Sequence, residues 1–199
     1  MAFTGCAKNN GSVRLNQEQA ATIKSLNLEI KRLNAELQAI NGSKQDLSKA
    51  KAELEDKLEG EMASGNLSVS MQDRGLVVTV LDRILFDSGK AELKPSSEST
   101  LEKVADILQE KAKDHMIYVE GHTDSEPIRR SGWRSNWELS TARATEVVHY
   151  FTENKNLDPE RLAATGYGEF HPVMDNESLE GRVKNRRVEI VVSPKQIGN

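Results

Sequence analysis

Cysteine is almost absent from this chain of 199 residues, in which Cys6 is the single thiol. One cysteine excludes an internal disulfide framework and any metal site built from several thiolates. Positive charge is also in deficit, because 27 lysines and arginines face 31 aspartates and glutamates and leave a net charge of −4. Nonspecific binding to nucleic acid requires a cationic surface, so we expect no nucleic-acid partner.

Long apolar runs are missing as well, and the longest, such as Val77–Leu81 and Ile190–Val192, are short. A membrane-spanning helix needs about 20 apolar residues, so we expect none in the chain as given. Hydrophobic residues make up 37% and charged residues 29% of the chain. The hydrophobic share is low for a chain that forms a single compact core and high for a chain that is disordered throughout. We therefore expect a globular domain joined to an exposed helical segment.

A heptad pattern occupies residues 14–60, with apolar residues spaced alternately three and four apart. Its seam consists of Ile23, Leu26, Ile30, Leu33, Leu37, Ile40, Leu47, Leu54 and Leu58. A 3.5-residue repeat held this long predicts a coiled coil, and therefore a dimer or trimer formed through this segment. Residues 23–61 would span roughly 58 Å as a helix. The alternative is one long amphipathic helix that folds back on the globular domain.

The pattern changes after Gly60–Asn66, which contains two glycines and marks a boundary. Alternating apolar residues predict strands, and a 3.6-residue period predicts two amphipathic helices between them. The expected strands are 67–71, 76–81, 115–120, 162–165 and 187–192, and the expected helices are 95–112 and 139–151. The order ββαβαβ, then a polar loop, then β, predicts an α+β fold: a two-layer sandwich with both helices on one face of a mixed sheet. The expected divisions are 1–13, 14–60, 61–66, 67–195 and 196–199, namely an N-terminal linker, a spacer, a second linker, a domain and a tail.

The residues of hydrolytic chemistry do not form a recognisable catalytic set. His122, Asp124 and Ser140 could be drawn as a triad, but no Gly-x-Ser-x-Gly motif surrounds Ser140, which lies near a helix start where capping is commoner. The four histidines lack the spacing of metal ligands. Gly166–Gly168 is too short for a nucleotide-binding loop. We therefore predict a protein that is not an enzyme and that carries no cofactor or metal.

A polar cluster does gather where the expected strands and helices begin or end. Gly121–Asp124 follows a strand, Asn136–Ala144 opens a helix, and Asn185–Arg187 precedes the last strand. A loop aspartate such as Asp124 can pair with an ammonium group, while Arg143 in the first turns of a helix can bind a carboxylate. Together they would form a receptor for a small zwitterion. The alternative, equally consistent with the spacing, is that Asp124 and Arg143 pair only with each other.

These residues lie in motifs whose order resembles the OmpA-like peptidoglycan-binding domain. The motifs are Phe86–Gly89, Leu93–Pro95, Val119–Asp124, Leu139–Ala144, Gly166–Gly168, Glu180–Arg182 and Asn185–Ile190. The resemblance covers roughly residues 67–195. It implies an OmpA-like sandwich that binds the peptide stem of peptidoglycan, at the free end of diaminopimelate, without cleaving it. It assigns the ligand to Asp124 and Arg143. The resemblance places four further residues in or beside the same pocket: Thr123, Asn136, Leu139 and Arg187.

Two segments, Ser125–Ser140 and Asp158–Glu169, resemble the flagellar stator (MotB-like) subgroup. A stator subunit carries an N-terminal membrane helix with a proton-carrying aspartate, whereas this chain offers a cysteine and heptads. Phe3–Cys6 resembles the end of a lipoprotein signal, in which Cys6 carries the lipid; the alternative is an unmodified surface cysteine. We therefore predict a periplasmic tether, lipid-anchored to the outer membrane of a Gram-negative bacterium and bound to the cell wall. The alternative is a stator-like or secretion-associated subunit, and a third possibility, a peptidoglycan hydrolase, lacks a nucleophile or metal ligands.

Overall fold

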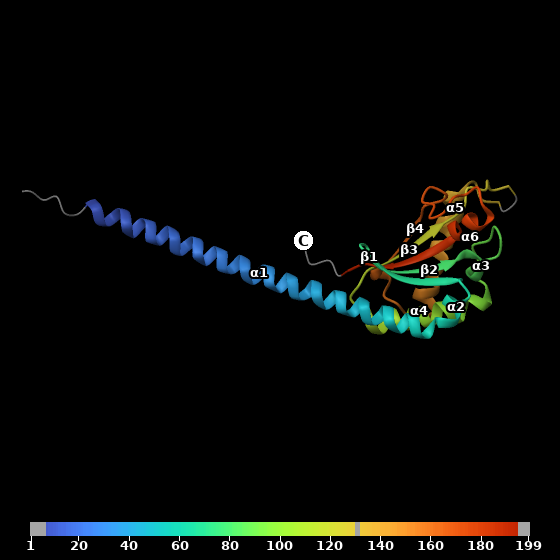
Figure 1. Ribbon diagram of the computed structural model, residues 1–199, viewed down its shortest axis with the longest axis horizontal. Coiled ribbons are helices and arrows are strands. Elements are labelled where there is room, and N and C mark those ends of the chain that lie inside the picture. The colour runs from blue at the N-terminus through green and yellow to red at the C-terminus, as the bar shows by residue number, and fades with distance from the viewer. Residues whose placement is uncertain (1–6, 130–131, 195–199) are drawn as a thin grey trace, which may run out of the picture. The chain divides into compact units, whose positions relative to one another are not determined.

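The computed structural model describes residues 7–129 and 132–194, with side chains described from Ser12 onward. Residues 43–194 form a compact unit, distinct from the described residues that precede Ser43. The elements labelled in Figure 1 are α1 (Ala7–Lys57), α2 (Glu59–Ala63), β1 (Leu67–Gln72), β2 (Gly75–Leu81), α3 (Asp82–Leu85), η1 (Pro95–Ser97), α4 (Glu98–Lys111), β3 (Ile117–His122), α5 (Asn136–His149), η2 (Tyr150–Asn154), η3 (Pro159–Arg161), β4 (Leu162–Gly166), α6 (Leu179–Asn185) and β5 (Arg187–Val192).

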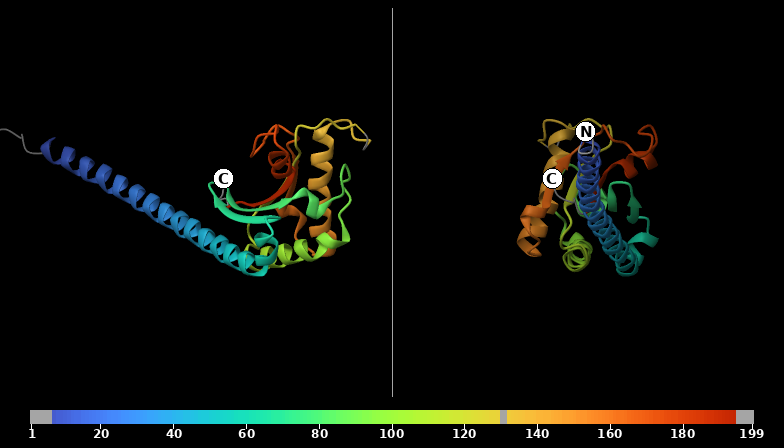
Figure 2. Two further views of the ribbon diagram at one scale, coloured as in Figure 1. Left: turned by 45° about the vertical axis from the view of Figure 1, so that its right-hand side comes forward. Right: turned by 90° about the vertical axis from the view of Figure 1, so that its left-hand side faces the viewer.

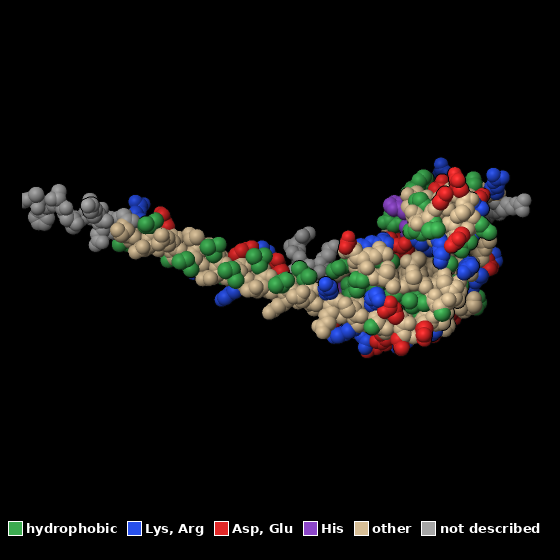
Figure 3. Space-filling view, viewed as in Figure 1, with side chains coloured by type: hydrophobic (Ala, Val, Ile, Leu, Met, Phe, Trp, Pro, Cys, Tyr) green, Lys and Arg blue, Asp and Glu red, His purple; other side chains and the backbone are tan. Residues whose placement is uncertain are grey.

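The part of α1 that precedes Ser43 carries an exposed apolar stripe. The seam residues of this part are 49–59% exposed: Ile23, Leu26, Ile30, Leu33, Leu37 and Ile40. Figure 3 shows hydrophobic side chains recurring along this part of the helix. Arg32 forms ion pairs with Glu29 and Glu36, one turn away on either side, and such pairs each add a few tenths of a kcal/mol to a helix. The predicted long helix is therefore confirmed.

The last turns of α1 belong to the globular unit, which corrects the predicted boundaries. Leu47, Ala50, Leu54 and Leu58 are at most 2% exposed and form part of the domain core. Residues 43–60 are thus not spacer, and the compact unit begins at Ser43 instead of residue 67. The heptad pattern could not show this, because an apolar stripe on a helix fits a coiled coil and a domain core equally well.

The five strands form one mixed sheet in the order β1-β2-β5-β3-β4. The β1–β2, β2–β5 and β5–β3 pairs are antiparallel, and β3 and β4 are parallel. A tight turn joins β1 to β2, and Gly75 follows it with a φ of +127°. A Cβ atom there would lie 2.1 Å from the carbonyl oxygen of Val192, so this edge of the sheet requires glycine.

The helices α4 and α5 pack against one face of the sheet, as predicted (Figure 2). Successive strand residues point to opposite faces. Ile117 and Val119 of β3 and Val188, Ile190 and Val192 of β5 therefore enter the core, while polar residues of the same strands lie on the other face. Three short helices, α2, α3 and α6, were not predicted, because a helix of four to seven residues is too short for its apolar period to be recognised.

Within the described parts of the chain, no helix is both long enough and apolar enough to pass through a lipid bilayer.

Candidate functional site

A cavity of about 700 Å³ opens beside the C-terminal end of β3 and the first turns of α5. Side chains from α3, from the loops that follow α3 and β3, and from α5 contribute to its wall. The charged and polar residues among them are Asp82, Arg83, Asp87, Ser88, Lys94, Thr123, Asp124, Glu126, Arg129, Asn136, Arg143 and Arg186. Five of the six predicted ligand-binding residues therefore line one cavity: Thr123, Asp124, Asn136, Leu139 and Arg143.

Arg143, on α5, is held on several sides and is 3% exposed. Its Nε donates a hydrogen bond of 2.9 Å to the carbonyl of Lys90, and Nη2 donates one of 3.4 Å to the carbonyl of Asp87. Nη1 lies 3.0 Å from Oδ1 of Asp82, and the guanidinium carbon lies 5.2 Å from the ring centre of Phe86. Burial lowers the pKa of Arg143 while the charge of Asp82 opposes that shift, and an arginine remains charged in proteins.

Asp124, in the loop after β3, is 5% exposed and has a different partner. Its Oδ2 accepts a short hydrogen bond from Nη1 of Arg186. Its Oδ1 accepts a hydrogen bond of 3.2 Å from the backbone N–H of Glu126. Asp124 thus pairs with Arg186, and Arg143 pairs with Asp82. The alternative in which Asp124 and Arg143 serve only each other does not describe the structure.

Asp82 is one of the two charged residues of this cavity's ion pairs that sequence reasoning missed, the other being Arg186. Asp82 is 7% exposed, and its Oδ1 makes the 3.0 Å ion pair with Arg143 without hydrogen-bond geometry. Burial raises the pKa of Asp82 to about 6, against the lowering effect of the Arg143 and Arg186 charges. An underused oxygen on a buried carboxylate is a place where a ligand cation can bind. The only signal in the sequence was its position just before the Phe86–Gly89 motif.

Asn136, the first residue of α5, fixes the loop that carries Asp124. Its side-chain amide donates hydrogen bonds to the carbonyls of Asp124, at 3.3 Å, and Glu126, at 3.2 Å. The same amide donates to the Glu169 carboxylate. One side chain therefore ties three segments together at the mouth of the cavity.

Thr123 and Leu139 supply two different surfaces of the cavity. Thr123 is 3% exposed, and its hydroxyl has no hydrogen-bond partner in the described part of the chain. Leu139 is 4% exposed and forms an apolar wall. A small ligand with a polar end and an aliphatic stem fits such a combination.

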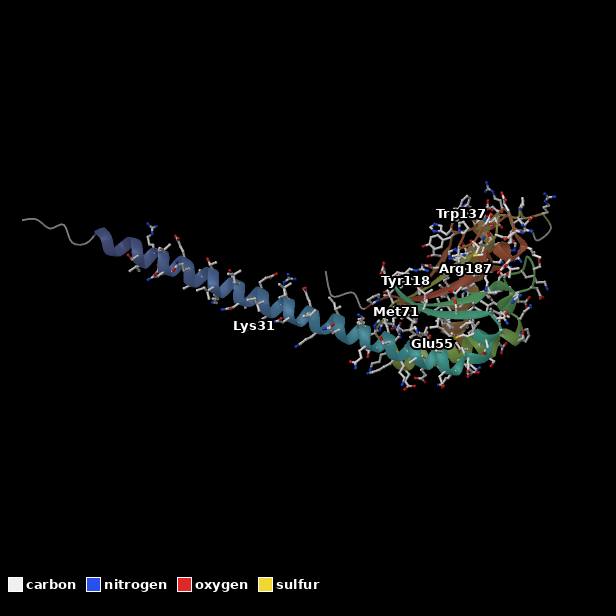
Figure 4. All side chains as sticks on the ribbon, in the orientation of Figure 1. Lys31, Glu55, Met71, Tyr118, Trp137 and Arg187 are labelled. Atoms are coloured by element: carbon white, nitrogen blue, oxygen red, sulfur yellow. The ribbon has the colours of Figure 1, made fainter. Side chains whose placement is uncertain are left out.

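Arg187 does not line this cavity, whereas the resemblance places it in or beside the same pocket. Its Nε donates a hydrogen bond of 2.6 Å to Glu189, and its other nitrogens donate to the carbonyls of Asn185 and His171, both at 3.2 Å. The preceding residue, Arg186, reaches the cavity instead. Successive residues at the start of β5 point in different directions, and Figure 4 shows Arg187 on the sheet.

Arg187 lines a second cavity of about 440 Å³ on the polar face of the sheet. Ligand atoms of Glu120, His122 and Glu189 lie there within 4.8 Å of one another, a spacing that could suit a metal ion. Arg74, however, already pairs with both glutamates, and Arg187 pairs with Glu189. The two acidic charges are therefore balanced by two arginines, and we assign no ion to this cluster.

The candidate triad of His122, Asp124 and Ser140 is not assembled. Both ring nitrogens of His122 lack hydrogen-bond partners among the described residues. Burial, followed by the Arg187 charge, lowers the pKa of His122 to about 3. The Ser140 hydroxyl donates to the carbonyl of Trp137 and accepts from the backbone N–H of Gly168, both at 3.0 Å. Ser140 therefore supports the fold.

The fold is a domain of the mixed α+β class whose cavity has acidic and basic side chains along its wall. Residues 85–186, about half of the chain, match the OmpA family. The chain therefore belongs to the OmpA family.

Relatives from several bacteria share this domain. The chain is 36% identical over 144 residues to motility protein B of Bacillus subtilis, a match that covers 72% of this chain and 55% of the relative. It is 34% identical over 140 residues to "Probable lipoprotein YiaD" of Escherichia coli, covering 70% of this chain and 61% of that protein. The chain thus spans little more than half the length of these curated relatives.

A solved structure with the same architecture is that of the cell wall anchor of the T6SS from Pseudomonas aeruginosa. Its TM-score to this chain is 0.65 at 33% sequence identity, and the match covers 72% of this chain and 99% of that one.

Proposed function

We propose that the domain binds the peptide stem of peptidoglycan, at the free zwitterionic end of diaminopimelate, without cleaving it. The observation that carries this proposal is the presence of two acid–base pairs on the wall of one cavity: the buried pair Asp82–Arg143, and the pair of buried Asp124 with half-buried Arg186. A zwitterion brings one cation and one anion, so it can replace the internal partners without leaving a buried charge unpaired.

The two ends of the ligand have distinct partners in this proposal. The ligand carboxylate accepts hydrogen bonds from Arg143, whose guanidinium is already oriented by backbone carbonyls. The ligand ammonium donates to Asp124 and to the underused Oδ1 of Asp82. Leu139 packs against the aliphatic stem. Preorganised charges of this kind reduce the cost of ordering on binding.

The names of the relatives support a role in the cell envelope. One similar structure is that of a cell wall anchor, and one relative is called a probable lipoprotein. We infer that the chain tethers the outer membrane, or an envelope complex, to the wall from the periplasm, with a lipid on Cys6. Cys6 lies outside the described residues. The second candidate is a stator-like or secretion-associated subunit, which the motility protein B relative favours.

Sedimentation with purified peptidoglycan sacculi tests the binding site. We expect Asp124→Asn and Arg143→Gln each to weaken binding by about 10- to 100-fold, because each removes a charge-assisted contact worth about 1.5–3 kcal/mol. Free diaminopimelate should release the wild-type chain. The matched control is Asp73→Asn, an exposed residue in the β1–β2 turn, which should bind as the wild type does. Two folded variants with wild-type binding would show that the site is elsewhere.

A further inference from the structure

A pair of stacked aromatic side chains lies exposed at the beginning of α5. Trp137 is 47% exposed and Phe170 is 59% exposed. Their ring centres are 5.1 Å apart with an interplanar angle of 23°. Figure 4 labels Trp137 on the domain surface. Single exposed apolar residues are common, but two exposed aromatic rings in contact concentrate apolar surface at one place, as binding sites do.

Trp137 also borders an open hollow of about 580 Å³ that runs along α5. The other lining residues are Glu138, Thr141, Ala142, Thr145, Glu146 and His149. The Thr141 and Thr145 hydroxyls donate hydrogen bonds to backbone carbonyls of their own helix, which leaves their oxygens able to accept. The hollow therefore combines one aromatic face with several hydrogen-bond acceptors and with acidic charge.

We propose that this hollow binds a pyranose ring of the glycan strand to which the stem peptide is attached. One face of a pyranose ring presents C–H groups with partial positive charge, which pack on the electron-rich face of an indole. The hydroxyls at its rim are donors for Glu138, Glu146 and the two threonines. The two carboxylates disfavour phosphate-bearing polymers, because like charges repel. This inference rests on the proposed function of the main cavity.

The position of the hollow fits a single wall fragment that reaches both sites. Asn136 and Arg143 face the main cavity, while the adjacent residue Trp137 borders the hollow on the same helix. The two sites are separated by the width of one helix, which is about 10–12 Å with its side chains. About three extended residues of a stem peptide span about 10 Å, so a short stem peptide can reach from one site to the other. The Asn136 hydrogen bond to Glu169 also ties the residue before Phe170 to the rim of the main cavity.

Calorimetric titration with soluble glycan strands, freed of their stem peptides by an amidase, tests the inference. We expect the wild-type chain to bind these strands, Trp137→Ala to weaken binding by about tenfold or more, and Trp137→Phe to restore part of it. Met71→Ala is the matched control, because Met71 is an apolar residue of β1 that is 40% exposed. It should bind the strands as the wild type does.

The two sites can be separated in the same titration. Trp137→Ala should keep wild-type affinity for free diaminopimelate, whereas Asp124→Asn should lose that affinity and keep the glycan strands. A wild-type chain that ignores peptide-free strands, or a Trp137→Ala chain that binds them as Met71→Ala does, would overturn the inference. A wild-type chain that does not bind free diaminopimelate would instead overturn the proposed function, whatever its binding to the glycan strands.

Discussion

At the scale of single residues, the cavity depends on two acid–base pairs that meet only in the folded chain. Asp124, Arg143 and Asn136 were identifiable because each lies within a recognisable motif. Asp82 was not, since only tertiary packing brings its carboxylate within 3.0 Å of Arg143. Arg186 was missed for another reason: the sequence cannot tell which of two adjacent arginines points toward a given face at the start of a strand.

Asp82 also makes stability depend on pH. Its pKa is about 6 in the folded domain, compared with 3.8 as the ordinary value. The folded state therefore binds this proton more tightly than the unfolded state, so this contribution to stability is full below about pH 4 and is lost as the pH rises through 6.

We expect Asp82→Asn, which stays neutral, to lose that dependence. Relative to the wild type, its free energy of unfolding should increase by up to roughly 3 kcal/mol between pH 4 and pH 7. Urea unfolding of both proteins at a series of pH values measures the difference. A difference that stays constant across this range would contradict the assigned role of Asp82.

At the scale of secondary structure, α1 serves two purposes with one repeating pattern. The sequence predicted the helix itself, as well as the sheet and its main helices, because long periodic segments are distinctive. It could not divide α1, since Leu33 and Leu54 occupy equivalent seam positions. Leu33 is 49% exposed and Leu54 is fully buried in the domain core. Only the packing partner distinguishes them.

Replacing a buried seam residue should therefore destabilise the domain itself. In a chain that starts at Ser43, we expect Leu54→Ala to lower the free energy of unfolding by about 2–5 kcal/mol, through lost burial and the cavity that remains. Lys44→Ala, an exposed change on the same helix, should stay within about 0.5 kcal/mol of the wild type. Chemical denaturation compares the three chains, and equal midpoints for all of them would refute the placement of residues 43–58 in the core.

The exposed stripe on residues 12–42 calls for a different experiment. Six seam residues at about half exposure leave an apolar surface that a second copy of the helix can bury. We expect the whole chain to be a dimer or trimer and the chain starting at Ser43 to be a monomer, as measured by multi-angle light scattering. A whole chain that remains monomeric at high micromolar concentration would exclude the coiled coil.

At the scale of the whole molecule, we propose that the chain joins a wall-binding domain to a lipid anchor on Cys6. Each buried CH₂ of an acyl chain adds about 0.8 kcal/mol, and stable anchoring takes more than one chain. When the native gene is expressed in a Gram-negative host, Cys6→Ser should move the protein from the membrane fraction to the soluble fraction. Its binding to sacculi should not change, because Asp124 and Arg143 remain. Mass spectrometry that finds an unmodified Cys6 in the membrane-bound wild type would rule out the anchor.

Calorimetric titration with matched ligands decides whether the cavity recognises both charges of a zwitterion. A stem peptide whose diaminopimelate keeps one free zwitterionic end is compared with the same peptide amidated at the carboxylate of that end and with the same peptide acetylated at the amine of that end. We predict binding of the free form and a loss of about tenfold or more for each capped form, since each leaves buried charges of the cavity without their partner. Equal affinity for all three ligands would show that the cavity does not recognise the two charges of the ligand.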